Sequence, residues 1–330
     1  MKPKSKNGED SRMNFGYIEK QEFVEFKKIK HRLIQSYPQG VYKVGPHNIP
    51  KFTGKGCVVG IIDSGLGDTL HKDLQANFIK EVDYVKDSDY DDHCNHVAGV
   101  ICANGNILGV AKNAKFISYR VYSDSAKNVR DKMIVGLCEA VKDGCNIINI
   151  SMGGKHSQKM EFIVKYAELH NVLIVAAAGN DYSKELTYPG YFSTKYENVI
   201  GVGAVEYNLN SGFVERALFS NCNKGVTCCS EGVDVLSTAT KNRYKTMSGT
   251  SMATPHVVGA AAVMWEELKY KNKGKVSVKE LKSKLLERTK DVFKAGDSRF
   301  RKKRDECSGY GFVTFFPKLK NIASQKNILH

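Results

Sequence analysis

The nine residues Ser248-Gly249-Thr250-Ser251-Met252-Ala253-Thr254-Pro255-His256 are the most informative stretch of this 330-residue chain. The apolar residues 257–268 that follow predict the body of a helix, with Ser251 at its start and Pro255 tolerated in its first turn. A serine at the start of a helix is often only an N-cap. Its hydroxyl becomes a useful nucleophile when a base lies within hydrogen-bond distance, and such a base must come from another part of the chain.

Two upstream stretches supply candidate partners for this serine. Residues 58–63 form an apolar run that ends on Asp63, where a buried carboxylate needs a hydrogen-bonding or charged partner. Residues 93–99, His-Cys-Asn-His-Val-Ala-Gly, contain two histidines, and spacing alone does not choose between His93 and His96. An aspartate, a histidine and a serine together can form an activated nucleophile, in which the histidine is the base and the aspartate orients its ring.

From residue 54 onward, short apolar runs alternate with helical stretches. Unbroken apolar runs are typical of parallel strands covered on both faces, so we expect an α/β fold with a doubly wound, mainly parallel sheet and helices on both faces. In such sheets the working residues follow the carboxyl ends of strands, which is where Asp63, Ser151 and Asn180 fall. The predicted strands cover residues 57–63, 115–122, 145–151, 172–178 and 199–205, and the predicted helices lie near 95–103, 129–141 and 159–170.

The order of the motifs along the chain, aspartate then histidine then serine, resembles that of the subtilases. In that family the motif His-Gly-Thr-His-Val-Ala-Gly carries the general base at its first histidine, which implies that His93 is the base and His96 a packed neighbour. The resemblance implies a serine endopeptidase with a catalytic triad of Asp63, His93 and Ser251. It also implies that Asn180, with the backbone N–H of Ser251, donates a hydrogen bond to the oxyanion formed during the reaction.

The histidine motif departs from the family pattern at Cys94 and Asn95, where glycine and threonine are usual. Both replacements are modest in size, so we expect the helix to persist. A thiol next to the base predicts that mercurials and oxidants inhibit the protein.

The same resemblance locates the substrate-binding residues. Ser151, Met152, Gly153 and Gly154 are similar to the Ser-Leu-Gly-Gly edge of the subtilase cleft, where glycines let a substrate backbone approach closely. We expect this edge to bind a protein or peptide substrate as an extended strand. In the family, a small residue at the position of Thr187 forms the floor of the first specificity pocket. A threonine there makes the pocket shallower, so we expect modest apolar P1 side chains to be preferred over large aromatic ones.

Residues 1–35 are expected to form an N-terminal extension, and residues 36–330 a subtilisin-like peptidase domain. The chain resembles the bacterial intracellular subtilisins, in which a short extension blocks the cleft until it is removed. Their inhibitory Leu-Ile-Pro-Tyr motif is absent here, and the segment Leu33-Ile34-Gln35-Ser36-Tyr37-Pro38 resembles it only in part. An inhibitory segment and an inert tail are therefore both left as alternatives.

No cofactor is expected to take part in the chemistry, and no metal ligand set is identified. Secreted subtilisins hold calcium in a loop after the catalytic-histidine helix, but the corresponding residues 104–110 carry no carboxylate. Asp73 alone is insufficient, because calcium takes several oxygen ligands. We expect that calcium site to be absent, and structural calcium at another site is left as an alternative. The chain also lacks a CxxC pair of the kind that binds zinc.

The composition, 42% hydrophobic and 26% charged, is typical of a soluble globular protein. No apolar run reaches the roughly 18 residues of a membrane span, and no apolar segment typical of a secretory signal follows the charged N-terminus. The nine cysteines are compatible with reduced thiols in a reducing compartment. We therefore expect a cytoplasmic protein, either a monomer or a homodimer.

The net charge of +15 is concentrated at 268–304, which holds fifteen lysines and arginines against four acidic residues. A nucleic-acid partner would favour basic residues interleaved with aromatic ones on a platform, so we expect a solvated basic surface and no nucleic-acid binding. A catalytically silent binding protein of the same fold is the other alternative. It is disfavoured because all three triad residues and the oxyanion asparagine are present.

Overall fold

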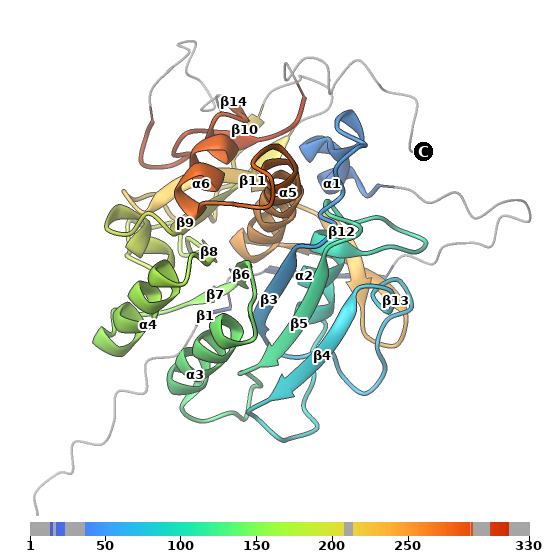
Figure 1. Ribbon diagram of the computed structural model, residues 1–330. Helices are drawn as coiled ribbons and strands as arrows, with labels where there is room; N and C mark the ends of the chain where they lie inside the picture. The colour runs from blue at the N-terminus through green and yellow to red at the C-terminus, as the bar shows by residue number, and fades with distance from the viewer. Residues whose placement is uncertain are drawn as a thin grey trace, which may run out of the picture.

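The computed structural model describes residues 37–207, 214–290, 292 and 304–316, together with the backbone of two short strands at 14–15 and 18–23. Its centre is a ten-stranded sheet with the order β14-β15-β11-β9-β8-β6-β3-β5-β4, with β10 paired to β9 (Figure 1). Neighbours from β15 to β4 run parallel, and β10 and β14 run antiparallel. The main strands are β3 (Val58–Asp63), β4 (Phe78–Asp83), β5 (Lys115–Arg120), β6 (Ile147–Ile150), β8 (Leu173–Ala177), β9 (Val199–Tyr207) and β11 (Val226–Glu231), and the short ones are β10 (Val214–Arg216), β14 (Thr289–Lys290) and β15 (Phe312–Val313).

Helices cover both faces of this sheet. Successive side chains of a strand point to opposite faces, and in β3 Ile61 packs with residues of α2 and α5 whereas Ile62 packs with residues of α3 and α4. The predicted doubly wound, mainly parallel α/β fold is therefore confirmed. The helices are α1 (Gln39–Val44), α2 (His93–Cys102), α3 (Val129–Lys142), α4 (Gln158–Leu169), α5 (Thr250–Lys271) and α6 (Val278–Leu286), with two 3₁₀ turns at Pro46–Asn48 and Gly190–Thr194.

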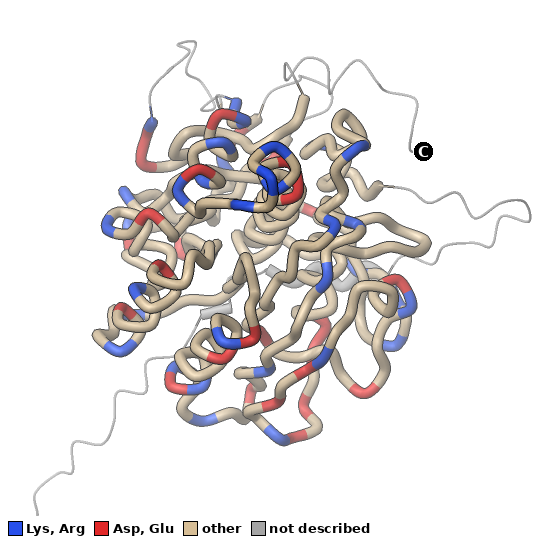
Figure 2. Tube along the Cα trace, in the orientation of Figure 1, with Lys and Arg blue, Asp and Glu red and all other residues tan. Residues whose placement is uncertain are grey.

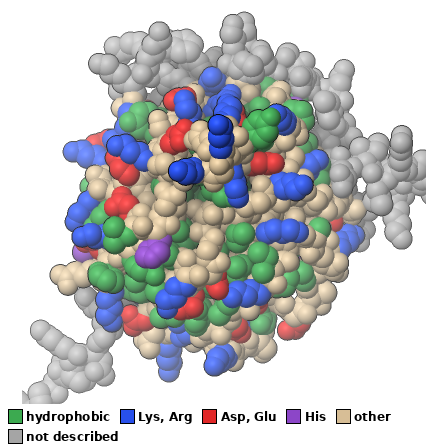
Figure 3. Space-filling model, viewed as in Figure 1, with side chains coloured by type: hydrophobic (Ala, Val, Ile, Leu, Met, Phe, Trp, Pro, Cys, Tyr) green, Lys and Arg blue, Asp and Glu red, His purple; other side chains and the backbone are tan. Residues whose placement is uncertain are grey.

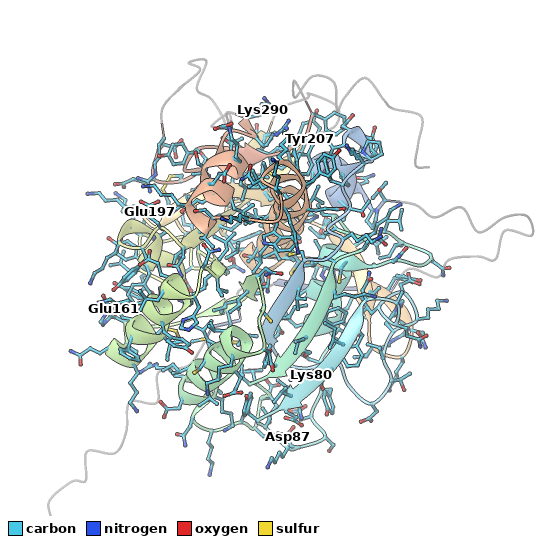
Figure 4. All side chains as sticks on the ribbon, viewed as in Figure 1. Lys80, Asp87, Glu161, Glu197, Tyr207 and Lys290 are labelled. Carbon is cyan, nitrogen blue, oxygen red and sulfur yellow. A yellow bond between two sulfur atoms is a disulfide. The ribbon has the colours of Figure 1, made fainter. Side chains whose placement is uncertain are left out.

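The five strands expected from apolar runs are all present, with ends shifted by at most two residues. The sequence reasoning missed β4, whose charged residues Lys80, Glu81 and Asp83 break the apolar pattern. A strand at the edge of a sheet tolerates such residues because one side is open to solvent. In Figure 4 Lys80 lies at this edge, where its ammonium pairs with Asp143 at 2.9 Å.

Two smaller sheets lie beside the central one and include strands from the first 35 residues. β1 (Asn14–Phe15) pairs antiparallel with β7 (Met152–Gly153), and the two lie side by side in Figure 1. β2 (Ile18–Phe23) pairs antiparallel with β13 (Arg243–Ser248), which also pairs with β12 (Val235–Ala239). The partial Leu-Ile-Pro-Tyr resemblance at 33–38 lies outside the described residues except for its last two positions.

One pair of cysteines contradicts the expectation of reduced thiols. Cys222 and Cys307, separated by 85 residues, form a disulfide, whereas the other seven cysteines are free. Neither partner lies in a motif, and only the folded chain brings them together. Among the residues described here, no helix is both long enough and apolar enough to cross a bilayer.

Candidate active site

Asp63 is the last residue of β3, and its side chain is fully buried. One carboxylate oxygen, Oδ1, accepts hydrogen bonds from Nδ1 of His93 at 2.7 Å and from the backbone N–H of Ser64 at 2.8 Å. Parallel neighbours β5 and β6 on either side hold β3 in place. The carboxylate is therefore fixed at the carboxyl edge of the sheet with the partner that its burial requires.

His93 begins α2, and its backbone N–H donates to Oδ1 of Asp91 at 2.9 Å. Burial lowers the pKa of the His93 imidazole, but the charge and hydrogen bond of Asp63, together with the charge of Asp91, outweigh it. The net result is a pKa above the ordinary value for histidine. The ring is thus both oriented and made more basic by carboxylates.

His96 lies one turn further along α2 and faces a different part of the fold. Its Nε2 lies 2.8 Å from the carbonyl oxygen of Val235 and 3.1 Å from that of Lys245. Burial lowers the pKa of His96 to about 3, which keeps the ring neutral. Of the two histidines, His93 is the one hydrogen-bonded to Asp63, which favours it over His96 as the partner of this carboxylate.

Ser251 is the second residue of α5 and is fully buried. Its hydroxyl donates to the carbonyl oxygen of Ser151 at 2.7 Å, and the hydroxyl of Ser151 donates in return to the carbonyl oxygen of Ser251 at 3.0 Å. The second bond is available because Pro255, four residues on, has no N–H for that carbonyl. The helix begins at Thr250, so Pro255 lies in its second turn rather than in the first turn expected from the sequence.

Asn180 follows the end of β8 by three residues and lies against the start of α5. Its Oδ1 accepts hydrogen bonds from the backbone N–H of Thr250 at 2.9 Å and from the Thr250 hydroxyl at 2.8 Å. Its Nδ2 is buried and has no hydrogen-bond partner among the described residues. An oriented amide donor without a partner, on a residue bonded to the Thr250 that precedes Ser251, suits an oxygen that becomes negative during a reaction.

The predicted substrate edge forms strand β7, directly after Ser151, and Gly154 bridges to Tyr188. Thr187 lies close behind this edge, since a Cβ added to Gly153 would collide with its methyl group and one added to Gly179 with its hydroxyl. Thr187 therefore occupies space between the two glycines.

The structure does not support the expected reactivity of Cys94. Its side chain is fully buried, with Sγ 3.6 Å from the hydroxyl of Ser118 in β5. Burial raises the pKa of the Cys94 thiol well above its ordinary value, which disfavours the reactive thiolate. The contact with Ser118 shows that the thiol points toward β5, whereas the ring of the neighbouring His93 points to Asp63.

The carboxylate of Asp73, considered above as a calcium ligand, is hydrogen-bonded to other parts of the chain. One carboxylate oxygen of Asp73 accepts hydrogen bonds from the Tyr244 hydroxyl at 2.8 Å and from the backbone N–H of Ile107 at 3.1 Å. Protein donors thus satisfy an oxygen that calcium would need. Within the described ranges, no group of three or more His, Cys, Asp or Glu side chains could hold a metal ion.

Two residues of the site, Asp91 and Thr250, were missed by sequence reasoning. Asp91 accepts a hydrogen bond from the Ser64 hydroxyl at 2.5 Å as well as from the His93 backbone, and Thr250 orients Asn180. The position of Asp91 two residues before the histidine motif was a usable signal, because a carboxylate near a helix N-terminus is favourable. The contact between Thr250 and Asn180 spans 70 residues and has no sequence signal.

Comparisons with known proteins agree with this arrangement. The model of the subtilase family, Peptidase_S8, matches residues 54–311. A thermophilic serine proteinase from Bacillus sp. (strain AK1) is 34% identical over 298 residues, which is 85% of this chain and 69% of the relative. An intracellular serine protease from Paenibacillus polymyxa is 33% identical over 274 residues, covering 78% of this chain and 81% of the relative.

Solved structures are similar as well. The S41 psychrophilic protease matches with a TM-score of 0.73 and 28% identity, over 86% of this chain and 99% of that one. Fervidolysin from Fervidobacterium pennivorans, a keratinolytic enzyme related to subtilisin, matches with a TM-score of 0.70 and 28% identity. The alignment covers 86% of this chain and 45% of fervidolysin. The chain therefore belongs to the subtilase family of serine proteases.

Proposed function

We propose that this protein is an endopeptidase that cleaves proteins or peptides through an acyl-enzyme on Ser251. The Ser251 oxygen attacks the substrate carbonyl carbon while its proton passes to Nε2 of His93, which then protonates the leaving amine. Water, deprotonated by the same imidazole, hydrolyses the ester and restores the serine. The observation that carries the proposal is the 2.7 Å bond from Nδ1 of His93 to buried Asp63, because it orients the imidazole and makes Nε2 the nitrogen that exchanges the proton.

Proton transfer to His93 requires the Ser251 hydroxyl to change direction. A hydroxyl carries one hydrogen, and here it is donated to the carbonyl oxygen of Ser151. Rotation of the side chain redirects that hydrogen toward the imidazole. Catalytic hydrogen bonds often tighten only when substrate binds, so the Ser151 contact represents a resting state.

The oxyanion of the tetrahedral intermediate accepts a hydrogen bond from Nδ2 of Asn180 and a second from the backbone N–H of Ser251. The orientation of Asn180 supports this role, because both of its bonds to Thr250 use Oδ1.

The substrate binds as an extended strand along β7, formed by Met152 and Gly153 with Ser151 and Gly154 at its ends. The antiparallel pairing of β1 with β7 supports this role, because it demonstrates that the edge can accept a strand. Thr187 limits the depth of the first specificity pocket, and we propose that modest apolar P1 side chains are preferred over large aromatic ones.

We further propose that residues 1–35 inhibit the enzyme. β1 pairs with the substrate edge and β2 pairs with β13, which ends two residues before Thr250, and only two residues separate β1 from β2. Both His93 and Ser251 are completely inaccessible to solvent. Because β1 is paired with β7, it competes with any substrate for the backbone hydrogen bonds of that edge.

No cofactor is needed, because nucleophile, base and oxyanion donor are all groups of this chain. A nucleic-acid partner is not proposed. Basic side chains gather around the end of α5 and α6, but acidic residues lie between them in Figure 2 and Figure 3. Lys271 pairs with Glu267 at 2.5 Å and Lys284 with Glu287 at 2.9 Å, as expected for a solvated surface.

We propose a cytoplasmic location, supported by the name of the Paenibacillus polymyxa relative, an intracellular serine protease. The Cys222–Cys307 disulfide weighs against it, because disulfides are rare in reducing compartments. Alkylation of thiols in intact host cells, followed by peptide mass spectrometry, tests the proposal. Reduced cysteines at both positions would support it, and a stable disulfide in the cell would contradict it.

Incubation with a diverse peptide library, followed by sequencing of the products, tests the proposed activity. We expect internal cleavage by the wild type and essentially none by Ser251→Ala, whose fold should be unchanged. Equal cleavage by both proteins would refute the proposed nucleophile.

A further inference from the structure

The loop that carries Asn180 makes several hydrogen bonds to one buried side chain, that of Asn221, which lies in the segment before β11. Its Oδ1 accepts hydrogen bonds from the backbone N–H of Asp181 at 2.9 Å and of Ser183 at 3.2 Å. Its Nδ2 donates to the carbonyl oxygen of Ala178 at 3.2 Å and to the carboxylate of Asp181 at 3.1 Å. Asn221 thus binds the chain on both sides of Asn180, and it is fully buried.

The backbone of Asn221 adds a further bond to the same loop. Its N–H donates to the carbonyl oxygen of Gly179 at 3.0 Å. Gly179 has φ of 103°, a conformation that favours glycine, and a Cβ there would collide with Nδ2 of Asn221. The loop and Asn221 therefore fit each other closely at the residue before Asn180.

The residue that follows Asn221 is also anchored, both to the loop and to a distant segment. The next residue, Cys222, is bonded to Cys307, and its backbone N–H donates to the carbonyl oxygen of Ser183 at 2.9 Å. In the turn that carries Cys307, Asp305 accepts hydrogen bonds from the backbone N–H groups of Cys307 and Ser308, both at 2.7 Å. Asn221 is thus fixed to two parts of the chain at once.

We propose that Asn221 is a positioning residue that sets the backbone of Asn180, and so places Nδ2 of Asn180 relative to the Ser251 hydroxyl. This inference rests on the oxyanion role of Asn180 proposed above. Thr250 orients the amide group of Asn180, and Asn221 places the backbone from which that amide projects. An oxyanion donor works over a narrow range of about 2.7–3.1 Å, so a small displacement of the loop weakens the bond that forms only in the transition state.

The test is the kinetic effect of Asn221→Ala in the full-length chain, with rates normalised to active sites titrated by a fluorophosphonate. We expect kcat to fall by about 10- to 100-fold, since a displacement of about 1 Å costs up to roughly 10². KM should change little, because the substrate edge at β7 is untouched. An unchanged kcat in a folded variant would overturn the proposal.

Asn198→Ala is a matched control. Asn198 is also buried, and its Nδ2 donates to the carbonyl oxygens of Val164 and Val172 at 3.2 Å each, beside α4 and away from the catalytic groups. This variant should lose thermal stability while keeping kcat. A similar fall in kcat for both variants would identify a general structural effect and overturn the proposal.

A double-mutant cycle with Asn180→Ala separates the two proposed roles. If Asn221 acts through Asn180, adding Asn221→Ala to Asn180→Ala should lower kcat by less than about twofold, whereas additive losses would contradict positioning. If Asn180→Ala alone leaves kcat unchanged, the oxyanion role itself fails. If Asn221→Ala does not fold, Asn221→Asp is tested instead, because it retains the acceptor bonds to Asp181 and Ser183 and loses the donor bonds of Nδ2. An unchanged kcat in Asn221→Asp would also overturn the proposal.

Discussion

At the scale of single residues, the basicity of His93 is set by opposing effects. Burial disfavours the charged imidazole, while the carboxylates of Asp63 and Asp91 favour it and raise its pKa above 6.5. A general base acts in its deprotonated form, so kcat/KM should rise with pH through an apparent pKa above that value. Asp91→Asn removes one of the two negative charges.

We therefore expect Asp91→Asn to move the acid limb of the pH–kcat/KM profile to lower pH. Asp131→Asn, an exposed carboxylate on α3 paired with Lys159, should leave the profile in place. A shift to higher pH in Asp91→Asn, or equal shifts in both variants, would contradict the proposed electrostatics.

Thr187 provides a second prediction at this scale. Its side chain lies between Gly153 and Gly179, so removing it should deepen the first specificity pocket. Thr187→Gly should raise the ratio of kcat/KM for a Phe P1 peptide to that for an Ala P1 peptide. The measurement uses matched peptides that differ only at P1. Faster cleavage of Phe than of Leu or Ala by the wild type would contradict the account.

Sequence motifs identified the residues with distinctive chemistry, and contacts between distant segments account for those that were missed. Asp63 ends an apolar run and His93 and Ser251 lie in motifs, so each could be selected before the fold was known. Asn221 could not, because its partners lie about 40 residues earlier and its local sequence has no special pattern. Buried amides of this kind are recognised only from the hydrogen bonds that they make.

At the scale of elements, the proposed inhibition by residues 1–35 rests on strands β1 and β2. Deletion of residues 1–35 removes both strands and should raise kcat/KM by tenfold or more, because substrate no longer competes with a covalently attached segment of high effective concentration. The described core clusters contain no residue before Tyr37, so the fold should persist.

Deletion of residues 1–10 alone is the matched control for that prediction, because it leaves β1 and β2 in place. Its kcat/KM should equal that of the full-length chain. If the protein that lacks residues 1–35 is folded by circular dichroism and has the same kcat/KM as the full-length chain, the segment is inert.

Apolar runs predicted the central strands, and alternation with helices predicted the layers around them. Elements with mixed composition were harder to recognise. β11 ends on the buried Glu231, which is paired with Lys43 of α1 at 3.0 Å. β1 has only two residues and exists through its pairing with β7. Their formation depends on tertiary partners rather than on local preference.

At the scale of the whole molecule, the parallel sheet brings the residues of the candidate site to one edge. Asp63 ends β3, Ser151 follows β6 and Asn180 follows β8, and these three strands are adjacent in the sheet. Helices α2 and α5 on the same face bring His93 and Ser251 to that edge. This convergence could be predicted from the fold class, whereas the disulfide and the pairing of the first 35 residues could not.

The most direct test of the central claim is to locate the adduct formed by a fluorophosphonate. Peptide mass mapping of the labelled chain should find the phosphonyl group on Ser251, with labelling abolished in Ser251→Ala and slowed strongly in His93→Ala. Labelling at another residue, or equal rates in the wild type and His93→Ala, would contradict a serine nucleophile activated by this histidine.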